Sequence, residues 1–176
     1  MNRLILFSIT GLALCLELAA APSPNLENSP HRFEVTAMHG RPAPDWDVTD
    51  WHNTTPLPIE SLKGKIIVLD FWATHCAACL AAVPAKNELA KKLAARGVVL
   101  LGICLRDGGD KLASTIERHG IRYPVALDAN GLTAKRFHVD SYPDYYVIDR
   151  AGRLRWGDID NRDLEKAVDI LLAETN

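Results

Sequence analysis

The sequence has little net charge, and it contains no internal repeat and no low-complexity block. Its 176 residues carry 20 Lys and Arg against 22 Asp and Glu, which gives a formal net charge of −2 at pH 7. A chain without a basic excess has no electrostatic reason to bind nucleic acid. With 48% hydrophobic residues, a chain of this length instead predicts one compact domain with its own core.

Cysteine is scarce, and no second pair of metal ligands accompanies the one close pair. The four cysteines are Cys15, Cys76, Cys79 and Cys104. A structural zinc site needs two ligand pairs, and the sequence has neither a second Cys-x-x-Cys nor two histidines at zinc-finger spacing. We therefore expect no cofactor. For the Cys76–Cys79 pair, redox chemistry is favoured over a permanent disulfide.

The cysteine pair lies at the junction between an expected strand and an expected helix. Ile66–Leu69 is a short run of apolar, mostly β-branched residues, which is typical of a strand buried on both faces. The sequence after the pair, rich in Ala, Leu and Lys, predicts a long helix that ends at Gly97. Both sulfurs then lie in the first helical turn, where free N–H groups stabilise a thiolate. This pattern favours disulfide exchange, with Cys76 as the attacking sulfur and Cys79 as the resolving sulfur.

The N-terminal residues 1–21 have the composition of an export signal. A short basic start, Asn2-Arg3, precedes the apolar run Leu4–Leu16, and Ala19–Ala21 offers small residues for cleavage. We interpret residues 1–21 as a signal peptide or an N-terminal anchor. The domain is then exported to a compartment where disulfides persist.

Residues 22–39 are expected to form a flexible linker before the domain at residues 40–176. This segment carries Pro22, Pro24 and Pro30 among polar residues and shows no hydrophobic periodicity. Beyond it, two short extended pieces between Trp46 and Ile59 suggest a β-hairpin added before the core.

The segment Asp70–Cys79 resembles the active-site segment of thioredoxins. Gly40–Trp46, Leu62–Lys65 and Tyr142–Gly152 are similar to the exported TlpA/ResA/DsbE-like branch of that family. The resemblance covers residue 40 to the C-terminus. It implies an α/β thioredoxin-like fold, a central mixed sheet flanked by helices, in which Asp110–Leu127 forms a central βα insertion.

The resemblance assigns proton handling to Asp70, at the end of the first buried strand. A carboxyl in apolar surroundings has a raised pKa and can exchange a proton with Cys79. The alternative is an aspartate that is solvated or caps the helix. Ala82 replaces a glutamate common in the branch, and Val98–Leu105 lacks the lysine of thioredoxins. We therefore expect Asp70 to act alone.

The resemblance also implies a substrate-binding surface around the cysteine pair. Pro143 corresponds to a cis-proline that faces the cysteines, which leaves the backbone of Tyr142 free to pair with an extended substrate. We place Trp72 beside the disulfide. His75 either stabilises the Cys76 thiolate or points to solvent. Cys104 is expected to be a buried, unreactive thiol.

By resemblance, the protein is a monomeric, periplasmic thiol-disulfide oxidoreductase, attached to the inner membrane only if its leader remains as an anchor. Its expected substrates are cysteines of exported proteins, for example the haem-binding cysteines of apocytochrome c. A membrane thiol reductant would supply its electrons. Two alternatives stay open: a net oxidant or isomerase that uses the same cysteines, and a chaperone that binds Cu(I) through two thiolates, with His75 as a further ligand.

Overall fold

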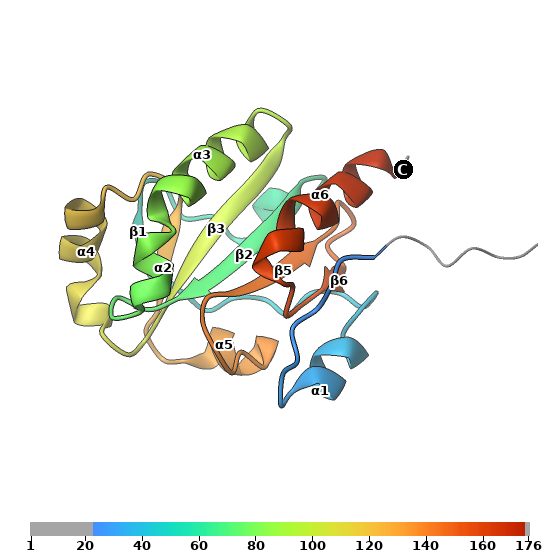
Figure 1. Ribbon diagram of the computed structural model, residues 1–176, viewed down its shortest axis with the longest axis horizontal. Helices are drawn as coiled ribbons and strands as arrows, with labels where there is room; N and C mark the ends of the chain where they lie inside the picture. The colour runs from blue at the N-terminus through green and yellow to red at the C-terminus, as the bar shows by residue number, and fades with distance from the viewer. Residues whose placement is uncertain (1–22, 175–176) are drawn as a thin grey trace, which may run out of the picture.

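The computed structural model describes residues 23–174, which form a six-stranded mixed sheet with helices on both faces (Figure 1). The strand order is β1-β4-β3-β2-β5-β6. The central strand β2 pairs in parallel with β3 and antiparallel with β5. This is the predicted α/β thioredoxin-like architecture. The strands are β1 (Thr49–His52), β2 (Ile66–Trp72), β3 (Val98–Leu105), β4 (Val125–Asp128), β5 (Asp144–Ile148) and β6 (Leu154–Trp156).

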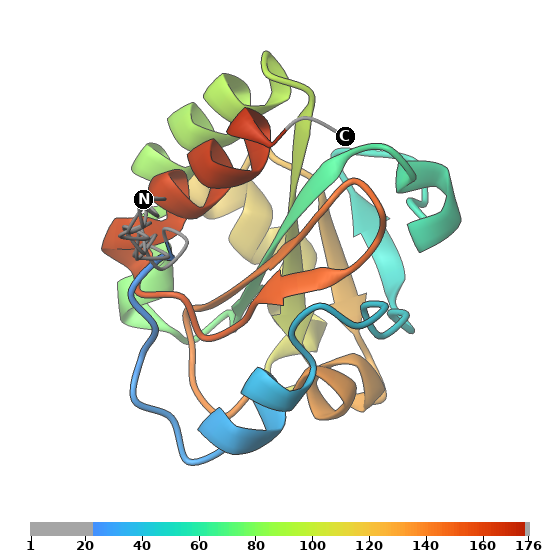
Figure 2. The ribbon, with the colours of Figure 1, turned by 90° about the vertical axis from the view of Figure 1, so that its right-hand side faces the viewer.

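The sheet separates two layers of hydrophobic core, and helices cover each layer. α3 and α6 run side by side over one face, and α1 and α5 lie against the other (Figures 1 and 2). The helices are α1 (Arg32–Ala37), α2 (Ala77–Ala81), α3 (Val83–Ala94), α4 (Leu112–His119), α5 (Leu132–Phe137) and α6 (Leu164–Ala173), with 3-10 turns η1 (Ile59–Leu62), η2 (Gly109–Lys111) and η3 (Asn161–Asp163).

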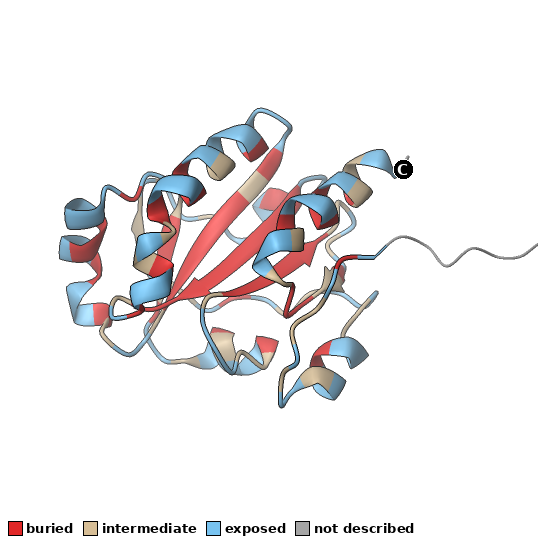
Figure 3. Cartoon of the chain, in the orientation of Figure 1, coloured by how far each residue is buried: buried red, intermediate tan, exposed pale blue. Residues whose placement is uncertain are grey.

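Strand β2 contributes to both layers because successive side chains point to opposite faces. Ile66 and Val68 join the layer under α3 and α6, whereas Ile67, Leu69 and Phe71 join the layer under α1 and α5. Every residue of β2 is buried, as the red central strands of Figure 3 show. A strand that is covered on both faces explains the uninterrupted apolar run in the sequence.

The predicted long helix is divided at Ala82 into α2 and α3. Pro84 is in the first turn of α3, where a missing N–H costs little, and its ring cannot donate to the carbonyl of Leu80. The break follows from this proline, and it leaves α2 as a short helix that carries the cysteines.

The predicted N-terminal β-hairpin is a single edge strand, which corrects that part of the sequence interpretation. β1 pairs antiparallel with β4, with a register shift between Thr49 and His52. Pro56 and Pro58 follow, and prolines lack the N–H groups that a second hairpin strand would need. The expected βα insertion does form, and it places β4 between β1 and β3.

The segment expected to be a flexible linker, residues 22–39, is packed on the domain over the part that the structure describes. Leu26 forms a β-bridge with Ile159, and Val35 of α1 is fully buried. These two apolar residues find partners in the fold, which the proline content of the segment did not reveal. The predicted leader, residues 1–21, lies outside the described residues. Among residues 23–174, no helix is both long and apolar enough to cross a bilayer.

Residues 40–43 cover the outer edge of β6. The N–H of Gly40 donates to the carbonyl of Leu154 at 2.7 Å, and the N–H of Leu154 donates to the carbonyl of Arg41 at 2.9 Å. Pro42 forms a bridge with Arg153. Both backbone groups of Leu154 at this edge are therefore paired within the chain.

Candidate active site

Cys76 and Cys79 form a disulfide at the N-terminal end of α2. Cys76 is the N-cap residue, and its Sγ accepts a hydrogen bond from the Cys79 N–H at 3.0 Å. Both side chains are largely covered, with 7% of Cys76 and 2% of Cys79 exposed. A backbone donor aimed at Cys76 Sγ stabilises the thiolate form of that sulfur once the disulfide opens.

A buried ion pair joins α3, the helix after α2, to strand β2. The Nζ of Lys86, on α3, donates to Oδ1 and Oδ2 of Asp70 at 2.8 and 2.6 Å, and also lies 5.3 Å from the centre of the Tyr145 ring. Asp70 is fully buried and Lys86 is 5% exposed. Burial raises the pKa of the Asp70 carboxyl, and the charge and hydrogen bonds of Lys86 act in the opposite direction.

The expectation that Asp70 has no basic partner is wrong, because Lys86 is paired with it. Val98–Leu105 does lack a lysine, but α3 supplies one from the other side of the core. Cys79, Val83 and Lys86 are all buried, at the i, i+4, i+7 spacing of a single helical face. This spacing is the feature of the sequence from which the burial of Lys86 could have been predicted. A charged residue at an apolar position of a helix predicts a buried partner.

Lys86 also lines a hollow of about 300 Å³ between α3 and α6. Tyr145 and Leu100 form its floor, and Arg162 and Glu165 lie on its α6 side. The ion pair is thus bordered by a hollow, lined by both apolar and charged residues, on the face of the sheet covered by α3 and α6.

The loop before β5 places Tyr142 and Pro143 against the disulfide. Their peptide bond is cis, as expected from the resemblance. The carbonyl oxygen of Tyr142 lies 3.9 Å from Cys76 Sγ. Tyr142 is 39% exposed, so a ligand can reach this residue from solvent.

His75 interacts with the same loop. Its Nε2 lies 2.8 Å from the Tyr142 hydroxyl, and the two rings meet edge to face at 5.7 Å. Asp107 is at 3.9 Å from the same nitrogen. The imidazole is half-exposed and bridges the two loops that flank Cys76, an arrangement that neither sequence alternative for His75 described.

Trp72 does not lie on the substrate-binding surface, where the sequence analysis placed it. Its side chain is 1% exposed and packs in the same core layer as the two cysteines. Cys104, directly opposite Trp72 on β3, is a buried free thiol, as predicted. Burial raises the pKa of Cys104 to about 12, so this sulfur stays protonated and unreactive.

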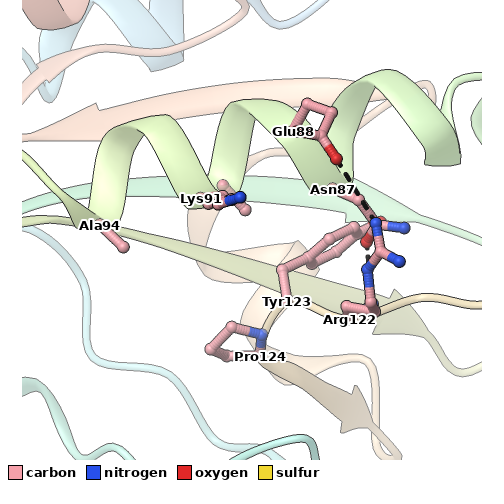
Figure 4. Close-up of a pocket in the computed structure, with 8 residues that line it drawn as sticks. Asn87, Glu88, Lys91, Ala94, Arg122, Tyr123 and Pro124 are labelled. Atoms are coloured by element: carbon pink, nitrogen blue, oxygen red, sulfur yellow. Dashed lines mark hydrogen bonds and ion pairs between the residues drawn. The ribbon is translucent and has the colours of Figure 1, made fainter.

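A second concave region has no cysteine among the residues that line it. A hollow of about 450 Å³ lies beside the C-terminal part of α3, where Glu88 and Lys91 face Arg122 and Tyr123 (Figure 4). Within residues 23–174, no group of three or more His, Cys, Asp or Glu side chains is arranged to hold a metal ion.

Fold and site together define a class. A Cys-x-x-Cys disulfide that caps a helix, next to a cis-proline loop on a thioredoxin-like sheet, is the arrangement of a thiol-disulfide oxidoreductase. The comparisons with known proteins agree, and they place the chain in a family. It belongs to the AhpC/TSA family, whose model matches residues 39–157.

Individual relatives carry the same chemistry in their names. The chain is 27% identical to the thiol-disulfide oxidoreductase ResA of Bacillus thuringiensis subsp. konkukian, over 87% of this chain and 86% of that protein. It is 26% identical to the thioredoxin-like protein YneN of Bacillus subtilis, over 83% and 88% of the two chains. A solved thiol-disulfide isomerase from Corynebacterium glutamicum superposes with a TM-score of 0.67 at 27% identity, covering 77% of this chain and 99% of that one.

Proposed function

We propose that the protein is an exported reductase that keeps cysteines of periplasmic proteins in the thiol state, with apocytochrome c as a candidate substrate. The hydrogen bond from the Cys79 N–H to Cys76 Sγ supports the exchange chemistry, because it favours Cys76 as the thiolate nucleophile. The direction, as a reductase, rests on the resemblance of the sequence to the TlpA/ResA/DsbE-like branch. The export-type composition of residues 1–21 and the ResA-like relatives support the location and the chemistry.

The reaction begins with the reduced protein. The Cys76 thiolate attacks one sulfur of a substrate disulfide, the substrate S–S bond breaks, and a mixed disulfide forms with Cys76. Cys79 then loses its proton and attacks Cys76 Sγ, which releases the second substrate sulfur as a thiol. Two electrons pass to the substrate, and the Cys76–Cys79 disulfide remains. A membrane thiol reductant restores the dithiol.

Asp70 accepts the Cys79 proton in this scheme. Its raised pKa makes the carboxyl a better base than an ordinary aspartate, and Lys86 keeps enough of it ionised to act. The hollow next to Lys86 gives that proton a way to solvent on the side away from Cys76. The substrate can then cover the disulfide during the exchange.

Substrate recognition is assigned to the loop around Pro143. An extended peptide pairs with the Tyr142 backbone, next to the sulfur it must reach. The side chains of Tyr142 and His75 border this position and limit the size of the residue beside the substrate cysteine.

The reduction potential of the Cys76–Cys79 couple tests the direction of the reaction. A reductase should have a value near that of thioredoxin, about −270 mV, rather than near the about −120 mV of a strong periplasmic oxidant. Equilibration with a glutathione or dithiothreitol buffer, followed by alkylation of free thiols, gives the value. A potential close to −120 mV would assign the protein as a net oxidant.

A further inference from the structure

Asp144, the residue directly after Pro143, is a buried acid with an unusual partner. Its side chain points into the core and is 2% exposed, and its Oδ2 lies 3.2 Å from the Tyr146 hydroxyl. The same hydroxyl lies 3.1 Å from Oδ1 of Asp158, which is equally buried. Two carboxyl groups thus share one tyrosine hydroxyl.

The number of available hydrogens favours a proton on one of these carboxyls. A tyrosine hydroxyl donates a single hydrogen and can accept another hydrogen bond, whereas an ionised carboxylate only accepts. Tyr146 can therefore donate to one carboxylate, and the second contact is a hydrogen bond only if the other carboxyl donates. Two ionised carboxylates would compete for the single hydroxyl hydrogen and repel each other in a buried site, which is costly.

The proton belongs on Asp144 because of what surrounds each carboxyl. The guanidinium of Arg32, on α1, lies 3.4 Å from Asp158 and forms an ion pair with it. Among the described residues, Oδ1 of Asp144 and Oδ2 of Asp158 both lack a hydrogen-bond partner, but only Asp158 has a cation beside it. The hydrogen bonds then run in one direction, from Asp144 to Tyr146 and from Tyr146 to Asp158.

The electrostatics of the surrounding elements agree with this assignment. Burial, followed by the charge of Asp158, raises the pKa of Asp144 to about 8, with smaller contributions in the same direction from Glu27 and Asp140. The hydrogen bond that joins the Asp144 carboxyl and the Tyr146 hydroxyl acts against them and lowers this pKa. His39 adds no cation, because burial and Arg32 lower its pKa and its Nε2 accepts from the Gly157 N–H at 3.2 Å.

The shared hydroxyl is held in place by the core. The Tyr146 ring packs edge to face against both Phe71 and Phe137, with ring centres 5.4 Å apart in each pair. Gly157 lies against the other side of the ring, where a Cβ atom would overlap it. The hydroxyl cannot swing away when its partners change charge.

The N-terminal segment, residues 25–39, is hydrogen-bonded to the loop between α5 and β5 at Asp140. Asp140 accepts hydrogen bonds from the Ser29 hydroxyl at 2.6 Å and from the His31 N–H at 3.4 Å. The residues between α5 and β5 are therefore anchored at Asp140 and at Asp144, and Tyr142 and Pro143 lie between these two anchors.

We propose that Asp144 is a positioning residue that, as a neutral hydrogen-bond donor, holds Tyr142 and Pro143 against the disulfide by linking them through Tyr146 and Asp158 to Arg32. Loss of the Asp144 proton places two anions at one fixed hydroxyl and releases the loop. The inference rests on the proposed role of Tyr142 and Pro143 in substrate binding. It adds a proton-dependent control of that surface.

Experiments on the oxidised protein test this, because its active-site cysteines do not titrate. The rate at which a small phosphine reduces the disulfide is compared between the wild type and Asp144→Asn from about pH 6.5 to about pH 9.5. Asparagine keeps a donor and cannot ionise, so the two proteins should agree at low pH. The wild type should then react about fivefold faster than the variant above pH 8, as expected for the loss of one buried hydrogen bond.

A peptide disulfide substrate should respond in the opposite sense, because its binding needs the ordered loop. The ratio of wild-type to variant rates for the reduced proteins should fall over the same pH range. If only the peptide result fails, the proposed substrate surface is wrong, whereas the phosphine result tests the loop alone. Asp169→Asn, a surface carboxyl on α6 that pairs with Arg96, is the matched control and should follow the wild type.

Two further measurements do not depend on Asp144→Asn and so remain informative if that variant fails to fold. Infrared difference spectra of the wild type around neutral pH should show the carbonyl band of a protonated carboxyl, which titrates near pH 8. Tyr146→Phe keeps the ring and removes the hydroxyl, so its phosphine rate should already be high at pH 6.5. Identical phosphine pH profiles for wild type and Asp144→Asn, or no protonated carboxyl at neutral pH, would overturn the proposal.

Discussion

Lys86 Nζ lies within 2.8 Å of both carboxylate oxygens of Asp70, and neither side chain is more than 5% exposed. Taking two charges out of water is expensive, and their attraction in the interior offsets that cost only while both are present. The pair therefore contributes little net stability as a unit, but each member depends on the other.

The first prediction concerns the stability of this pair. Lys86→Met should lower the free energy of unfolding by about 3–5 kcal/mol, because it leaves a buried carboxylate without a partner. Asp70→Asn should also destabilise the fold, since the ammonium loses its counter-ion. The double variant Asp70→Asn/Lys86→Met should recover most of the loss. Urea unfolding of all four proteins measures the coupling, and additive single effects would contradict it.

The second prediction concerns proton transfer at Cys79. The charge-balanced double variant removes the acid without leaving an isolated buried ammonium, so it separates catalysis from folding. It should reduce protein disulfides about 10²-fold or more slowly, the usual contribution of a general base. Its rate-versus-pH curve should also be flatter than that of the wild type. An unchanged pH profile would move the acid–base role to His75 or to solvent.

The third prediction separates the two active-site sulfurs. Cys76→Ser should abolish disulfide exchange, because Cys76 is the sulfur that accepts the Cys79 N–H bond and contacts the Tyr142 loop. Cys79→Ser should instead accumulate mixed disulfides with substrates, because no second sulfur resolves them. Non-reducing electrophoresis and mass spectrometry detect the adducts. Adducts on Cys76→Ser but not on Cys79→Ser would reverse the assignment.

A fourth prediction follows from the raised pKa of Asp144. Its pKa is about 8 in the folded protein and about 4 when unfolded, so folding takes up a proton between these values. The stability contributed by the protonated form is complete below about pH 4, declines as pH rises to about 8, and is then constant. The free energy of unfolding of Asp144→Asn should therefore rise relative to the wild type across this window, by a few kcal/mol. Parallel curves would contradict the assignment.

The fifth prediction concerns Cys104. Its burial and raised pKa should keep it a thiol in the oxidised protein, resistant to alkylation unless the fold is denatured. Peptide mapping after labelling under native and denaturing conditions distinguishes the two states. A disulfide between Cys104 and Cys76 or Cys79 would be inconsistent with the active site described above.

Local sequence patterns predicted most of the fold. β2 could be recognised from Ile66–Leu69 because burial on both faces requires a continuous apolar run, and the β5–β6 hairpin follows from a turn around Gly152. β1 was harder, because its partner is β4, some 75 residues further on. A short extended segment does not reveal whether it pairs with its neighbour or with a distant strand.

The parts of the site that the sequence did not predict depend on long-range contacts between charges. Asp70 and Lys86 are 16 residues apart on different elements, and although Lys86 follows the spacing of the apolar face, that spacing does not say which acid is its partner. Asp158 and Arg32 are even further apart in the chain. Cys76, Cys79 and Pro143 could be predicted from the sequence, because each has a local signature in its spacing or in its neighbouring residues.

The closed edge of β6 has a consequence for how this protein meets its clients. Polypeptides that have not yet folded expose extended segments, and these readily add to any free strand. Residues 40–43 already occupy that position on β6, and β1 at the opposite edge is only four residues long and irregular. An unfolded client therefore finds no long template for cross-β growth at either side of the sheet. We therefore expect neither edge of the sheet to act as a template for aggregation.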